Sequence, residues 1–163
     1  MKKKVIGALL ALSLQGLTGC TSTGGYGNYA TAPLHFNQKM AQDTAAQLVT
    51  LYLPAKTHLS LKQRIPPRDT YGTALVEALR ANGYSVLEYT PQKRATRSQS
   101  TRFQPSAIKA PVPTIDLRYI VDAPKSTNFY RVTVQVGTGS ISRVFTLAPE
   151  GKLYPASAWI RRE

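Results

Sequence analysis

The chain has 163 residues, of which 42% are hydrophobic and 18% charged, a composition typical of one modest folded domain. Lysine and arginine outnumber aspartate and glutamate by 21 to 8, which gives a formal charge of +13. The single cysteine excludes an intrachain disulfide and a metal cage built from cysteines, so packing alone must stabilise the domain.

Residues 1–19 have the features of a signal peptide that is removed from the mature protein. Lys2–Lys4 form a positively charged start, and residues 5–17 form a short apolar run that is interrupted by Gln15 and Gly16. This run falls short of the ~20 apolar residues that a membrane-spanning helix needs. We therefore expect this segment to direct export and to contribute nothing to the fold.

The segment ends in Leu17, Thr18, Gly19 and Cys20, which resembles the lipobox of bacterial lipoproteins. Small residues before the cleavage point give a peptidase access to the backbone, and the Cys20 thiol is the atom that accepts a diacylglycerol. Acylation at sulfur and nitrogen would anchor this terminus almost permanently, because each buried methylene contributes ~0.8 kcal/mol. Thr21 stands where an aspartate would resemble an inner-membrane retention signal, so we expect the outer membrane, with the domain facing the periplasm.

Residues 20–36 contain no lysine, arginine, aspartate or glutamate and are predicted to form a lipidated flexible tether. The folded domain is expected to begin at Asn37, which can cap a helix whose apolar positions recur as far as Pro54. Leu59 and Leu61 are then predicted to face inward on a short strand.

Residues 69–89 carry the clearest secondary-structure signal. Asp69 is a favourable N-cap, an apolar stripe follows it, and Asn82-Gly83 supplies a left-handed C-terminal stop. Residues 84–89 are predicted to continue as a strand. The helical stripe comprises Tyr71, Leu75, Ala78, Leu79 and Asn82.

Residues 90–113 lack periodicity and are rich in proline, serine, threonine and glutamine, which predicts a long basic loop. Such a loop could contact DNA phosphates, lipid phosphates or an acidic protein, or its charge could serve solubility alone. Solubility is favoured over nucleic-acid contact, because only Phe103 is interleaved and no nucleic-acid motif is present. The candidate partner-binding residues are Lys93, Arg94, Arg97, Arg102 and, on a later strand, Arg143.

Three alternating strands follow, over residues 115–121, 130–136 and 141–147. Gly137-Thr138-Gly139 fits a hairpin turn between the last two better than a phosphate loop. A final stretch carries Trp159. The element order predicts a single α+β domain over residues 37–163, with two helices packed on a mostly antiparallel sheet.

The sequence contains no arrangement that indicates an active site. His35 and His58 are isolated, the acidic residues are scattered, and no G-x-S-x-G elbow is present. We therefore expect a protein that is not an enzyme and that needs neither a cofactor nor a metal.

Six segments are informative through their order along the chain: residues 51–57, 71–80, 83–89, 117–122, 141–143 and 158–163. Together with the lipobox they resemble the conjugal transfer protein TrbH, a family of lipoproteins. The resemblance implies a lipid-anchored structural component of a mating-pair-formation apparatus, a type IV secretion system that moves plasmid DNA between bacteria, with other channel subunits as its partners. The residues alone leave open a free-standing outer-membrane lipoprotein that binds peptidoglycan, lipid or DNA through its basic surface.

Overall fold

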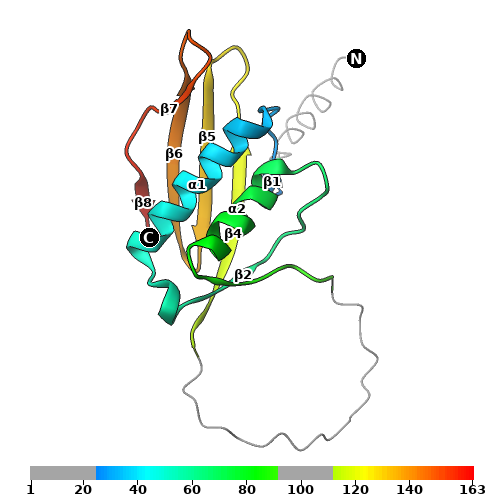
Figure 1. The fold of residues 1–163 in the computed structure, drawn as a ribbon, viewed down its shortest axis with the longest axis vertical. Helices are drawn as coiled ribbons and strands as arrows, with labels where there is room; N and C mark the ends of the chain where they lie inside the picture. Colours follow the sequence, from blue (N-terminus) through cyan, green and yellow to red (C-terminus); the bar gives the residue numbers. More distant parts are fainter. Residues whose placement is uncertain (1–24, 92–111) are drawn as a thin grey trace, which may run out of the picture.

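The computed structural model describes residues 25–91 and 112–163. Two helices lie side by side on one face of an eight-stranded sheet, and the described residues place no helix on the other face (Figure 1). The predicted α+β class, with two helices on a mostly antiparallel sheet, is confirmed. In the same residues, no helix is long and apolar enough to cross a membrane.

The elements occur in an α-β-α-β order that is followed by an antiparallel meander. The helical elements are α1 (Leu34–Leu51), the 3-10 turn η1 (Pro54–Lys56) and α2 (Thr70–Ala81). The strands are β1 (Gly27–Asn28), β2 (His58–Leu61), β3 (Ser85–Leu87), β4 (Thr114–Asp122), β5 (Phe129–Val136), β6 (Gly139–Leu147), β7 (Leu153–Pro155) and β8 (Ile160–Arg162).

The first helix begins at Leu34, four residues earlier than a helix capped by Asn37 would begin. Pro33 is its N-cap residue, and Asn37 is buried inside the helix, where its amide donates to the Ala32 carbonyl and the Thr70 hydroxyl. Asn37 therefore joins α1 to the start of α2 instead of capping α1. Because β1 also pairs with β4, residues 25–36 belong to the fold, and the expected tether over residues 20–36 does not extend through them.

The second helix agrees with the prediction at both ends. The Asp69 carboxylate accepts a hydrogen bond from the Gly72 amide at 2.9 Å, and Gly83 has a φ of +87°, which a residue with a side chain rarely adopts. Tyr71, Leu75 and Leu79 are completely buried. This stripe is the surface that α2 presents to the sheet.

The sheet has the strand order β3-β2-β4-β5-β6-β7, with β1 added to β4 and β8 added to β6. β2 is parallel to both β3 and β4, whereas β4 to β8 pair in antiparallel fashion. β4 meets β2 along its first half and β1 at residues 120–121. Between β2 and β1, the backbone amide of Tyr119 donates to the side-chain oxygen of Gln63 at 2.8 Å. At this point of β4 a side chain therefore supplies the hydrogen-bond acceptor that a neighbouring strand would otherwise supply.

The core lies between the helices and the sheet. Alternate residues of the long strands face the helices and are fully buried, including Tyr119, Val132 and Phe145. Met40 and Leu48 of α1 belong to the same core cluster and pack on its helix side. Alternation therefore leaves the intervening residues of β4, β5 and β6 on the opposite, helix-free side.

Candidate interaction surfaces

The predicted site residues fall mostly outside the described part of the chain. Leu17, Thr18, Gly19 and Cys20 precede it, and Lys93, Arg94, Arg97 and Arg102 lie in the second range that is not described. Lipid attachment and partner binding at these positions stay predictions. Arg143 is the one candidate whose surroundings can be read from the structure.

Arg143 faces the helices and is held by contacts within the domain. Its Nη1 donates to both carboxylate oxygens of Asp43, at 2.8 and 3.0 Å, and its Nε donates to the Ser157 carbonyl at 2.8 Å. The Trp159 indole donates to the same carboxylate at 3.2 Å. The guanidinium also lies 5.8 Å from the Trp159 ring centre. Arg143 thus fixes the C-terminal segment against α1 and β6, which leaves few of its donors for a partner.

A second polar cluster lies inside the core, between α2 and β4. The Tyr119 hydroxyl donates to the Asp69 carboxylate at 2.5 Å, and the Tyr71 and Thr44 hydroxyls lie 2.9 Å apart. Burial, reinforced by the bond to Asp69 and its charge, raises the pKa of Tyr119 far above its ordinary value. Burial likewise raises the pKa of Tyr71. Both phenols are completely buried, so this cluster positions α2 on the sheet and offers no surface to a ligand.

The close approach of α2 to β4 depends on Gly72. A Cβ added at this position would lie 2.0 Å from the Tyr119 hydroxyl oxygen and 3.1 Å from Oδ2 of Asp69. The hydrogen bond between Asp69 and Tyr119 therefore needs a residue without a side chain in the first turn of α2.

The helix-free side of the sheet, called the outer face below, carries two ordered rows of side chains. The strand register places one row on Arg118, Gln135, Ser140 and Arg162, and the next on Ile120, Thr133, Ser142 and Ile160. Both rows run across β4, β5, β6 and β8. An amide and a hydroxyl thus lie between the two arginines in one row, and two hydroxyls lie between the two isoleucines in the other.

Tyr26 lies over the first row. Its hydroxyl donates to Oε1 of Gln135 at 2.5 Å, and the Arg118 guanidinium lies 5.2 Å from its ring centre. The described chain therefore starts against the outer face, although β1 itself pairs at the edge of β4.

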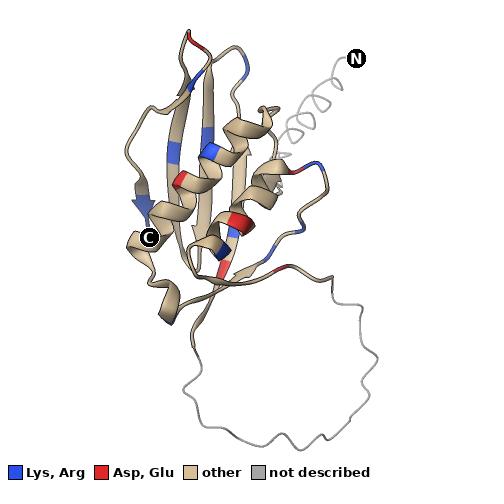
Figure 2. Ribbon diagram, in the orientation of Figure 1, with Lys and Arg blue, Asp and Glu red and all other residues tan. Residues whose placement is uncertain are grey.

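Charges are interspersed over the described domain, with basic residues on β5, β6 and β8 as well as on α1 (Figure 2). On the outer face, Arg131 is paired with Asp122 at 2.8 Å. Among the described residues, Arg118 and Arg162 have no carboxylate within ion-pair distance, so they provide the excess positive charge of this face. In the same part of the chain, no group of three or more histidine, cysteine, aspartate or glutamate side chains could hold a metal ion.

Neither Arg118 nor Tyr26 was predicted from the sequence as a contact residue, whereas the C-terminal Arg161-Arg162 pair had the same possible roles as the basic loop. A signal for Arg118 was present, because it alternates with inward-facing Leu117 and Tyr119 on a predicted strand. Its alignment with Arg162 and its contact with Tyr26 depend on strand register and could not be read from spacing.

Comparison with known proteins agrees with the earlier resemblance. The sequence model of a family described as conjugal transfer protein TrbH matches residues 22–163. No curated protein and no solved structure shows a significant match. The matched range includes every described element, from β1 to β8. The chain belongs to the conjugal transfer protein TrbH family.

Proposed function

We propose that this protein is a lipid-anchored structural subunit of a conjugative type IV secretion apparatus, held at the outer membrane and facing the periplasm. Family membership makes it a component of conjugal transfer. The anchor, the membrane and the structural role go beyond what the family match shows, and they form the proposal. The observation that carries it is the family match that begins at residue 22, two positions after the end of the lipobox-like Leu17–Cys20.

The geometry supports a role in protein contacts rather than catalysis. Two polar clusters, around Asp43 and around Asp69, make their hydrogen bonds within the domain and stabilise its packing. Such a domain suits a fixed part of a larger assembly, whose partners would be other channel subunits. The basic residues Lys93, Arg94, Arg97 and Arg102 remain candidate contacts for those partners.

A mating assay tests the proposal directly. Deletion of the gene from the transferring plasmid should abolish or strongly reduce transfer, and the wild-type gene supplied in trans should restore it. Cys20→Ala should fail to restore transfer, since the thiol that accepts the lipid is absent. Labelling with radioactive palmitate and flotation of membranes should show lipid on the wild type and none on Cys20→Ala.

The outcomes separate the alternatives. Normal transfer in the deletion strain would overturn the conjugation role. Full complementation by Cys20→Ala would show that plasmid transfer does not need the lipid anchor, and the proposed structural role would stand without it. If crosslinking recovered peptidoglycan but no channel subunit, the protein would instead be a free-standing envelope lipoprotein.

A further inference from the structure

We propose that the outer face of the sheet docks on the anionic surface of the bilayer that holds the Cys20 lipid, so that α1 and α2 point away from the membrane. This inference rests on the lipid anchoring proposed above. Two observations carry it: the place where the described chain begins relative to the helix layer, and the chemistry of the outer face.

The first observation is the short distance along the chain between the lipid and the outer face. Gly25 is five positions after Cys20, and these five steps of the chain span at most ~18 Å even when fully extended. Gly25 is followed at once by Tyr26, whose side chain is fastened to Gln135 and Arg118 on the outer face. The bilayer surface must therefore lie within reach of this side of the sheet.

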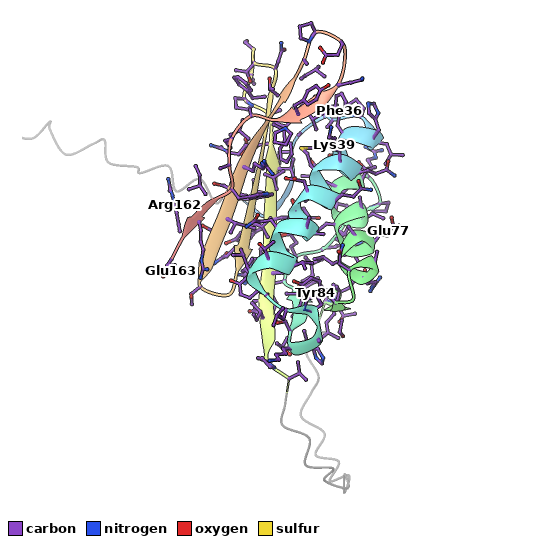
Figure 3. All side chains as sticks on the ribbon, turned by 60° about the vertical axis from the view of Figure 1, so that its left-hand side comes forward. Phe36, Lys39, Glu77, Tyr84, Arg162 and Glu163 are labelled. Carbon is purple, nitrogen blue, oxygen red and sulfur yellow. The ribbon has the colours of Figure 1, made fainter. Side chains whose placement is uncertain are left out.

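The helix layer lies on the other side. A helix with its side chains is about 10–12 Å thick, so a bilayer beyond α1 and α2 would require the tether to pass around the sheet and across that layer. Figure 3 shows this arrangement, with Arg162 on one side of the molecule and Glu77 of α2 on the opposite side. So short a tether favours a bilayer on the same side of the sheet as Tyr26.

The second observation is the chemistry of the outer face. Arg118 and Arg162 end a row that crosses four strands, and neighbouring strands are ~4.8 Å apart, so the row is about 15 Å wide. The side-chain amide nitrogen of Gln135, whose Oε1 accepts from Tyr26, and the hydroxyl of Ser140 lie between the two arginines. Guanidinium groups bind phosphate oxygens through charge-assisted hydrogen bonds, and an anionic bilayer presents phosphates across a plane.

The neighbouring row adds an apolar contribution. Ile160 is 55% exposed, although most isoleucines in a folded domain are buried. Ile160 and Ile120 end this row on the same strands as the two arginines. An exposed apolar side chain beside arginines suits the boundary between headgroups and acyl chains.

The test uses the lipidated protein in vesicles. Cys20 is the only cysteine and its thiol carries the lipid, so an added cysteine is a unique labelling site. A fluorophore is attached at Ser142→Cys on the outer face or at Glu77→Cys on α2. The proteins are reconstituted into vesicles of phosphatidylethanolamine and phosphatidylglycerol that contain a headgroup-attached quencher.

We expect strong quenching at position 142 and weak quenching at position 77. The double variant Arg118→Gln/Arg162→Gln should lose this difference while remaining in the floated vesicle fraction. Replacing phosphatidylglycerol with phosphatidylcholine, or adding high salt, should have the same effect, since both weaken electrostatic attraction. The control Lys39→Gln/Lys56→Gln removes the same charge from α1 and η1 and should keep the difference.

Two failures can be told apart. If the wild type does not float with the vesicles, the lipid anchor fails, and the docking inference fails with it. If the wild type floats but both labels are quenched equally, or if the arginine variant behaves like the wild type, the anchor stands and the docking inference is overturned. The outer face would then be free to bind a protein subunit.

Discussion

Arg143 of β6 and Asp43 of α1 lie 100 residues apart in the chain and form an ion pair at 2.8 Å that joins the helix layer to the sheet. The Asp43 carboxylate also accepts from the Trp159 indole, so one acidic side chain ties a helix, a central strand and the C-terminal segment together. Only 20% of the Arg143 side chain and 28% of the Asp43 side chain are exposed.

Asp43→Ala should lower the free energy of unfolding by about 2 kcal/mol, because it leaves a largely buried guanidinium and an indole without their acceptor. Urea unfolding followed by circular dichroism measures the change. The matched control is Glu88→Gln, which breaks the Arg80–Glu88 pair, whose side chains are half exposed. That change should cost no more than about 0.5 kcal/mol. Equal losses in the two variants would show that the Asp43 contact is an ordinary surface pair.

Gly72→Ala should destabilise the domain by about 1–3 kcal/mol, although alanine is the better helix former. The added methyl group would collide with the Tyr119 hydroxyl, which itself is fixed to Asp69. Tyr119→Phe removes that oxygen and should relieve part of the damage, which gives a favourable coupling in a double-mutant cycle. Strictly additive losses would contradict the proposed collision.

Stability should decline at alkaline pH. The pKa of Tyr71 and that of Tyr119 are raised by burial above the ordinary value of 10.0, so the native state keeps two protons that the unfolded chain releases. Their stabilisation is fully present below about pH 10 and is lost as the pH rises above it, by up to about 1.4 kcal/mol per pH unit for each group. Urea unfolding at a series of alkaline pH values measures this slope.

Tyr71→Phe removes one of the two groups and should make the alkaline decline correspondingly less steep. The comparison is made between slopes and not between absolute stabilities, because the variant also loses the contact with the Thr44 hydroxyl. A slope identical to that of the wild type would mean that Tyr71 ionises as readily in the folded protein as in the unfolded chain.

Leu79→Ala should cost about 2–5 kcal/mol, since Leu79 is completely buried on the stripe that α2 presents to the sheet. Leu87→Ala is a matched control, because the same atoms are removed from a side chain that is 53% exposed at the edge of the sheet. The control should change the free energy of unfolding by no more than about 0.5 kcal/mol. A comparable loss at both positions would show that Leu87 is covered, for example by a partner.

Local features were predictable because they depend on neighbours along the chain. Asp69 caps α2 as expected, Gly83 ends that helix in a left-handed conformation, and alternation identified the inward residues of β4, β5 and β6. The start of α1 was misplaced for the same reason. Asn37 has the residue type of a cap, but its amide finds partners in Ala32 and Thr70, and the second of these is brought to it only by the fold.

The sequence by itself predicted two helices on a mostly antiparallel sheet and pointed to the family, because periodicity, caps and motif order are written along the chain. Tertiary structure alone decided that β2 lies between β3 and β4, that Gln63 fills a gap beside β4, and that Arg143 is engaged by Asp43. It also aligned Arg118 with Arg162 beneath Tyr26. These relationships join residues far apart in sequence, and their energies depend on strand register and close packing, which no local pattern records.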